Sequence, residues 1–88
     1  MGNKKLKIQI KFFAIYRDKA GINSIELDFP EGSNVEIAAK EILRLYPKIS
    51  IHPSDLVVAV NQEYVEHDHL LKEADEMALI PPVSGGSK

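Results

Sequence analysis

The residues that most clearly suggest a chemical role lie at the C-terminal end of the sequence. There, Pro81 and Pro82 precede a segment with two adjacent glycines, Gly85 and Gly86. Glycine has no β-carbon, so this backbone can take any φ and enter a narrow channel. The prolines end any preceding strand and stiffen the base of the segment. A frayed terminus is the alternative interpretation, because chain ends are commonly disordered. From composition alone, both hypotheses stay open.

His67, Asp68 and His69 form the one cluster of metal-ligand residue types in the sequence. Their spacing matches no common metal site, and no third strong ligand is evident. We therefore predict no metal site, and instead a polar turn in which Asp68 accepts hydrogen bonds from local backbone amides. The serines fall in predicted loops or caps without a nucleophile elbow, and no glycine-rich phosphate loop precedes a helix.

Composition sets the general class. The chain has 88 residues, a net charge of −2 and no cysteine. This length predicts a single small domain, and the lack of cysteine excludes disulfides, a thiol nucleophile and a redox pair. The charge argues against a general nucleic-acid binder. Without an apolar run of membrane-spanning length or a secretory signal, we predict a cytoplasmic protein with no membrane partner.

Alternation of apolar and polar residues predicts an antiparallel pair of strands at 6–12 and 25–29, joined by a wide connection. Residues 14–20 are predicted to form a helical turn that ends at Gly21 in the left-handed conformation. Phe13 falls on the lysine-rich side of the first strand. An aromatic residue there is either covered by another element or exposed for a partner.

A helix of about three turns is predicted after residue 33. Ser33 to Glu36 has the pattern of a capping box, and Pro47 ends the helix. Its apolar stripe consists of Val35, Ala38, Ala39, Ile42, Leu45 and Tyr46. Three further strands are predicted at 56–60, 64–65 and 77–80.

This order of elements predicts a ubiquitin-like β-grasp fold of the α+β class. A mixed sheet of four to five strands would carry one main helix on one face, because one helix cannot cover both. The crossover rule makes the strands before and after that helix parallel. We assign residues 1–82 to the β-grasp domain and residues 83–88 to a flexible C-terminal Gly-Gly tail.

A series of short motifs spans residues 6–86. They are Phe12-Phe13-Ala14, Arg17-Asp18, Gly21, Pro30-Glu31-Gly32, Ala59-Val60-Asn61, Asp68-His69, Asp75-Glu76 and Pro81-Pro82-Val83-Ser84-Gly85-Gly86. In order and spacing they resemble the small subunit of molybdopterin synthase, a ubiquitin-like sulfur carrier. The Pro-Pro-Val-Ser-Gly-Gly ending is the most specific part.

The resemblance implies that the Gly86 carboxylate is the reacting group. A ubiquitin-activating-like adenylyltransferase would adenylate it with ATP, and it would then become a thiocarboxylate. That sulfur would serve dithiolene formation in molybdenum cofactor biosynthesis. The chain would bind no cofactor and would act as a co-substrate subunit rather than as a catalyst.

The resemblance also implies docking to the large subunit of the synthase through an apolar patch of Phe13, Tyr64 and Ile80. The partner would also hold the tail, formed by Pro81, Pro82, Val83, Ser84 and Gly85. Arg17 matches a basic position of the family, and we expect it to pair locally with an acid.

Two departures from the family matter. Ala74 replaces a turn glycine, where a left-handed backbone would cost about 1 kcal/mol. Ser87-Lys88 follows Gly86, so the Gly86 carboxylate is held in a peptide bond. Either a processing protease removes both residues, or the extension is an artefact, or this chain has lost carrier activity. The alternatives are a ubiquitin-like modifier or a sulfur carrier for another pathway, such as tRNA thiolation or protein conjugation, and a binding module that never reacts.

Overall fold

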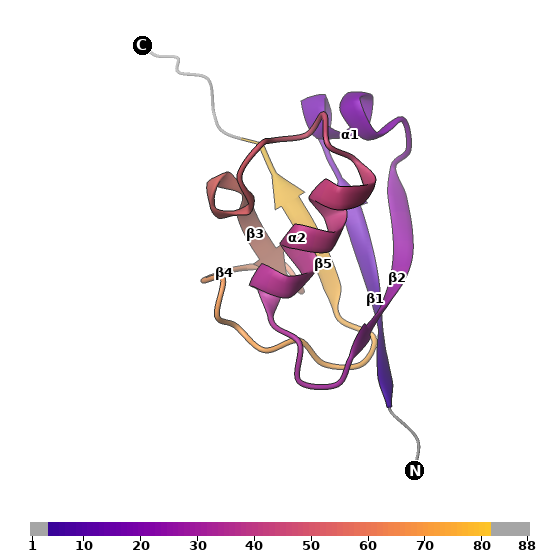
Figure 1. Cartoon of the computed structure of the whole chain (residues 1–88), viewed down its shortest axis with the longest axis vertical. Coiled ribbons are helices and arrows are strands. Elements are labelled where there is room, and N and C mark those ends of the chain that lie inside the picture. Colours follow the sequence, from indigo (N-terminus) through magenta and orange to yellow (C-terminus); the bar gives the residue numbers. More distant parts are fainter. Residues whose placement is uncertain (1–3, 82–88) are drawn as a thin grey trace.

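Five strands form one mixed sheet in the order β2-β1-β5-β3-β4, and helix α2 lies across one face of it (Figure 1). The computed structural model describes residues 4–81. The strands are β1 Lys5–Phe12, β2 Ser24–Pro30, β3 Val57–Val60, β4 Glu63–Val65 and β5 Glu76–Ile80. The helices are α1 Ala14–Ala20, α2 Val35–Leu45 and a 3₁₀ turn, η1 Pro53–Asp55, between α2 and β3.

The strand directions confirm the predicted β-grasp. β1 is antiparallel to β2 and parallel to β5, and β3 is antiparallel to both β5 and β4. Strands β2 and β3, which precede and follow α2, therefore point the same way, as the crossover rule predicted. Gly21 ends α1 with φ of 80°, which confirms the predicted left-handed cap.

The core lies between the sheet and α2. Alternate residues of β1, namely Leu6, Ile8, Ile10 and Phe12, are buried, and so are Met77 and Leu79 of β5. The helix contributes Val35, Ala38, Ala39, Ile42 and Leu43. The predicted stripe is wrong in one member, since Leu43 is buried while Leu45 is 37% exposed. Burial also raises the pKa of the Tyr16 hydroxyl, and the Asp55 carboxylate raises it further.

The start of α2 differs from the predicted capping box. The cap is Asn34, whose Oδ1 accepts a hydrogen bond from the Ile37 N–H at 3.0 Å. The buried Ser33 hydroxyl instead donates to the Pro30 carbonyl at 2.7 Å. Glu36 consequently lies one residue too early to complete the box, and it pairs with Lys40 at 3.4 Å.

In two turns, residues other than glycine have a positive φ in the left-handed region. Asn61 and Gln62, with φ of 52° and 75°, join β3 to β4, as a type I′ hairpin turn requires. The Asn61 side chain fixes this turn to β5, because it donates to the buried Asp75 carboxylate and accepts from the Glu76 N–H. Ala74, which replaces the turn glycine of the family, has φ of 70°. The chain therefore adopts the left-handed conformation at this position despite the β-carbon of alanine.

We predict that Asn34→Ala lowers the free energy of unfolding by about 1 kcal/mol, because the Ile37 N–H loses its partner. Urea denaturation measures the effect. Asn34→Asp keeps an acceptor and is the matched control, with an expected change of only about a few tenths of a kcal/mol. An unchanged Asn34→Ala stability would contradict this assignment of the cap.

We predict that Ala74→Gly raises the free energy of unfolding by about 1 kcal/mol, because glycine has no β-carbon to clash at positive φ. For a domain of this size the melting temperature should rise by roughly 4–8 °C. Ala38→Gly, inside α2, is the control and should destabilise the protein. A lower melting temperature for Ala74→Gly would show that the turn is not left-handed.

Candidate functional site

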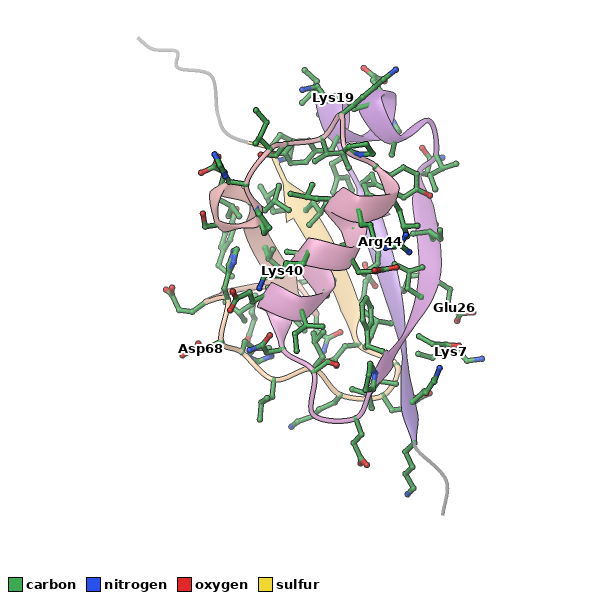
Figure 2. All side chains as sticks on the ribbon, in the orientation of Figure 1. Lys7, Lys19, Glu26, Lys40, Arg44 and Asp68 are labelled. Atoms are coloured by element: carbon green, nitrogen blue, oxygen red, sulfur yellow. The ribbon has the colours of Figure 1, made fainter. Side chains whose placement is uncertain are left out.

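The face of the sheet opposite α2, called the open face below, displays the strand residues that alternate with the core. Because Ile10 pairs with Met77 on the core side, the neighbouring pair Lys11 and Ala78 faces the other way. Lys7 pairs with Asp28, and Gln9 with Glu26, so β1 and β2 make this part of the open face polar. Figure 2 shows Lys7 and Glu26 along these two strands.

The other half of the open face is apolar. Val57 pairs with Ile80, and Ala59 pairs with both Ala78 and Tyr64, so the side chains of all five lie on the open face. Tyr64 is 73% exposed and Val57 46%, while Ile80 is half-buried. Large apolar side chains gathered on an uncovered sheet face are typical of an interface.

Phe13 extends this surface past the end of β1. Its backbone is extended, with φ of −124° and ψ of 151°, so it continues the alternation of the strand. Phe12 is 2% exposed in the core, whereas Phe13 is 44% exposed. The parallel pairing of Phe12 with Leu79 brings Phe13 beside the end of β5. We call Phe13, Val57, Tyr64 and Ile80 the apolar patch.

The structure thus places Phe13, Tyr64 and Ile80 on one face, and their role in docking stays a prediction. Val57 belongs to the same patch, but the sequence analysis missed it. It lies in the continuous apolar run that begins at Leu56, and such a run does not reveal which of its members face the uncovered side of the sheet. The side of the sheet on which Val57 lies follows from its pairing with Ile80, which is remote in the sequence.

The base of the predicted tail adjoins this patch. Pro81 is half-buried and follows Ile80 directly at the end of β5. Proline has no N–H to extend the ladder, so strand pairing stops here. The other predicted tail residues, Pro82, Val83, Ser84, Gly85 and Gly86, lie outside the described residues, as does the assignment of 83–88 as a tail.

Charges border the apolar patch on the β1 side. Lys11 and Glu76 form an ion pair at 3.4 Å. Arg17 is exposed and lines a shallow hollow together with Phe13. Within residues 4–81 no carboxylate lies at ion-pair distance from Arg17, so the predicted local pairing is wrong there.

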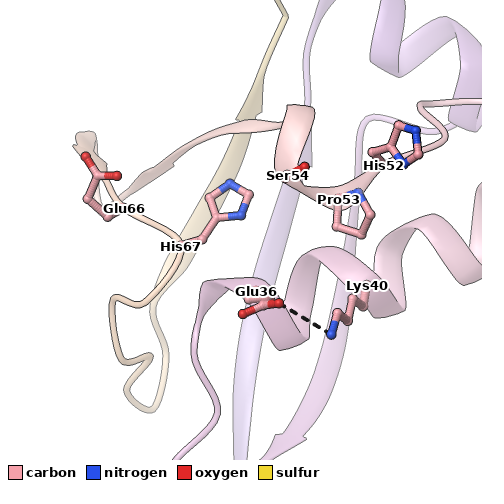
Figure 3. Close-up of a pocket in the computed structure, with 7 residues that line it drawn as sticks. All are labelled: Glu36, Lys40, His52, Pro53, Ser54, Glu66 and His67. Atoms are coloured by element: carbon pink, nitrogen blue, oxygen red, sulfur yellow. Dashed lines mark ion pairs between the residues drawn. The ribbon is translucent and has the colours of Figure 1, made fainter.

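A second, polar hollow of about 510 Å³ lies beside α2 and η1 (Figure 3). It is lined by Glu36, Lys40, His52, Pro53, Ser54, Glu66 and His67. The His67 ring is held by the Leu56 carbonyl, 2.7 Å from Nε2. Between residues 4 and 81 no hydrogen bond joins Ser54 to a histidine.

The His67-Asp68-His69 segment supports α2. The His67 and His69 carbonyls accept hydrogen bonds from the Glu36 and Val35 N–H groups at the start of the helix. The predicted bonds from local amides to Asp68 are absent among residues 4–81. In the same part of the chain, no group of three His, Cys, Asp or Glu side chains could hold a metal ion. No helix of the described chain is long and apolar enough to cross a membrane.

Comparison with known proteins identifies the relatives of this chain. The ThiS family matches residues 10–86, so the match ends at Gly86. The molybdopterin synthase sulfur carrier subunit of Chlamydomonas reinhardtii is 35% identical over 83 residues, covering 92% of this chain and all of that protein. A putative molybdopterin converting factor, subunit 1, from Pyrococcus furiosus has a TM-score of 0.80 at 32% identity, covering 89% and 99% of the two chains.

SAMP1 from Haloferax volcanii has the same fold, with a TM-score of 0.76 at 25% identity over 91% of this chain and 99% of that one. The family match, the curated relatives and these two structures agree on a ubiquitin-like carrier architecture. The chain belongs to the ThiS family, on the branch of the molybdopterin synthase sulfur carrier subunits.

Proposed function

We propose that this chain is the sulfur carrier subunit of molybdopterin synthase and that its Gly86 carboxylate is the reacting group. The observation that carries the proposal is the near-full-length similarity to curated sulfur carrier subunits, together with a family match that ends at Gly86. The large subunit of the synthase is the partner. The absence of cysteine suits the reducing cytoplasm in which we place the reaction.

In the proposed reaction this chain supplies the Gly86 carboxylate, and its partners supply all other reacting groups. The Gly86 carboxylate attacks the α-phosphorus of ATP on an adenylyltransferase, and pyrophosphate leaves. A persulfide sulfur on a partner then attacks the acyl carbon and displaces AMP, which gives an acyl disulfide. A second thiol of the partner attacks the sulfur that belongs to the partner, so the sulfur–sulfur bond breaks, the thiocarboxylate leaves and the partner is oxidised to a disulfide. This chain holds no cofactor and needs no catalytic side chain for either step.

The apolar patch gives the docking surface for the large subunit. Phe13, Val57 and Tyr64 are exposed and Ile80 is half-buried, and Ile80 directly precedes Pro81 at the base of the tail. A partner seated on this patch would therefore hold the chain close to where the tail begins. Two glycines at the far end would let the acyl group enter a narrow active site.

Ser87-Lys88 requires one further step. Both residues lie beyond the family match, and the peptide bond to Ser87 blocks the carboxylate of Gly86. We propose that a protease hydrolyses this bond, which adds water and separates Gly86 from Ser87-Lys88. Ubiquitin-like precursors are processed in the same way.

A second candidate function is protein conjugation. The likeness to SAMP1, a small archaeal modifier protein, favours it. In that case the amine of a target lysine would attack the Gly86 acyl adenylate and displace AMP, which gives an isopeptide bond in place of a thiocarboxylate.

We predict that only a chain ending at Gly86 accepts sulfur. After incubation with the adenylyltransferase, ATP and a sulfur donor, intact mass spectrometry should show the exchange of one oxygen for sulfur. The full chain with Ser87-Lys88 is the matched control and should keep its mass. Products linked to lysine would favour the ubiquitin-like modifier. If the chain ending at Gly86 does not react but still binds the large subunit, the protein would be a binding module that never reacts.

We predict that Tyr64→Asp and Val57→Asp each weaken binding to the large subunit by about 30-fold or more, because each would bury a charge at the centre of the interface. Isothermal titration calorimetry measures the affinity, and circular dichroism checks the fold. Ile51→Asp is the control, since Ile51 is 85% exposed in a loop outside the sheet and should bind normally. Folded patch variants with normal affinity would refute this docking surface.

A further inference from the structure

Strand β2 forms one edge of the sheet and is long enough to accept a further strand. The sheet order leaves β2 with a single neighbour, β1 (Figure 1). Its pairing with β1 runs without a bulge from Ser24 to Pro30. The strand at the other edge, β4, has only three residues. Sheet edges are commonly protected by short strands or bulges, and β2 has neither.

The hydrogen bonds at the two ends of the β1–β2 ladder show how the backbone of β2 is oriented. The Phe12 N–H donates to the Asn23 carbonyl at 2.9 Å, and the Glu31 N–H donates to the Lys4 carbonyl at 3.1 Å. In an antiparallel ladder such pairs alternate with pairs whose N–H and C=O groups point away from each other. Every second residue of β2 therefore directs its N–H and C=O away from β1.

Glu26 and Asp28 are the central residues of this outward set. Their partners on β1, Gln9 and Lys7, point the opposite way, since the N–H groups of both donate to the segment before β5 at 3.0 Å. Within residues 4–81 no other element bonds to the N–H groups of Glu26 and Asp28. The centre of the β2 edge thus presents backbone donors and acceptors for another strand.

An apolar hollow of about 380 Å³ lies between β2 and α2 beside this edge. It is lined by Phe29, Pro30 and Ile37 together with the side chains of Lys40, Glu41 and Arg44. Figure 2 shows Arg44 and Lys40 on the helix. Both cations are already paired, Arg44 with Glu41 at 2.7 Å and Lys40 with Glu36 at 3.4 Å. Ile37 is 45% exposed, so the hollow suits apolar side chains.

The other side of the same edge is acidic. Glu26 and Asp28 are exposed on the open face, and in the described part of the chain no cation lies at ion-pair distance from either. The strand that already pairs with β2 alternates Lys5, Lys7 and Lys11 on this face with buried apolar residues on the other. A strand added at the edge should have the same alternation, because side chains on adjacent strands are neighbours.

A second copy of the chain does not have this character. Antiparallel pairing of two β2 edges would place Glu26 and Asp28 of one copy against the same carboxylates of the other. Like charges on neighbouring strands destabilise a sheet. The charges of the edge therefore favour a different, basic partner.

We propose that the β2 edge and the adjacent hollow form a second docking surface, which accepts an extended protein segment that alternates basic and apolar residues. The segment would add one strand to the sheet through main-chain hydrogen bonds to Glu26 and Asp28. Its apolar side chains would enter the hollow, and its basic side chains would lie beside the two carboxylates. Because β1 and β5 separate β2 from β3 and β4, this partner need not compete for the apolar patch.

Titration of the full chain with a synthetic peptide tests the inference without any other protein. The probe is a capped peptide in which lysine and valine alternate over about six residues, a typical strand length. Its binding should slow the hydrogen exchange of the Glu26 and Asp28 N–H groups, as NMR can measure. A peptide that alternates glutamate and valine is the control and should bind roughly 3-fold weaker or less. Unchanged exchange with the lysine peptide would overturn the inference.

Variants of the edge separate backbone pairing from charge. Asp28→Pro removes an outward N–H at an edge position, where proline is tolerated, and should weaken peptide binding by about 10-fold. Glu26→Gln combined with Asp28→Asn keeps the backbone and should weaken binding roughly 3- to 10-fold. Glu63→Gln removes a carboxylate from the other edge strand and should leave the affinity unchanged. Normal affinity in the double variant would refute the charge complementarity, even if Asp28→Pro does not fold.

Two further measurements concern the hollow and the occupant. Ile37→Ala removes part of the apolar wall and should weaken peptide binding roughly 3-fold, whereas Ile51→Ala, at an exposed loop residue, should have no effect. Sedimentation velocity of the chain alone should show a monomer. A dimer that Asp28→Pro dissociates would overturn the proposed partner and assign the edge to a second copy.

Discussion

The parallel pairing of β1 with β5 is the interaction on which the rest of the structure depends. It joins the first strand to the last through the register from Gln9 and Glu76 to Phe12 and Leu79. Each of these central strands carries an antiparallel neighbour, β2 on one side and β3 on the other. Without the central pair, the β1–β2 hairpin and the β3–β4–β5 unit would share no sheet. The pairing also brings the end of β5 next to Phe13, and with it the start of the proposed reactive tail.

A second constraint is that one main helix covers one face of this sheet (Figure 1). The buried set on the α2 side forms the core, so the opposite face has no intramolecular cover in the described chain. Its apolar half exposes the side chains of Tyr64 and Val57 to water, which is unfavourable. A partner that buried these side chains would gain that free energy.

Polar groups that suggest chemistry in the sequence serve the fold instead. The carbonyls of His67 and His69 satisfy N–H groups at the start of α2, which have no partner within the helix. Asp75 is buried, and its carboxylate accepts from Asn61 and from the Lys72 N–H. These contacts fix the segment between β4 and β5 to the helix and to the hairpin turn. The backbone carbonyls of His67 and His69 thus support α2, and the His67 ring contacts the Leu56 carbonyl.

Local patterns in the sequence determined the secondary structure and the fold class. Alternation marked the strands around Ile8 and Leu27, and Gly21 and Pro47 marked where helices end, because these signals depend on residues close in the chain. The capping residue of α2 was misplaced by one position, since Ser33 and Asn34 can both cap a helix and only the tertiary structure engages Ser33 with Pro30. The motifs also identified the family and the candidate patch members Phe13, Tyr64 and Ile80.

Tertiary structure alone decided which surfaces are free. Val57 belongs to the apolar patch because its register with Ile80 turns it away from α2, and a continuous apolar run carries no record of that register. The left-handed backbone of Ala14, and the lack of an ion pair at Arg17 within residues 4–81, are likewise visible only in the tertiary structure. The sequence determined the elements because their signals are local. The exposed face was decided by the pairing of strands that are far apart in the chain.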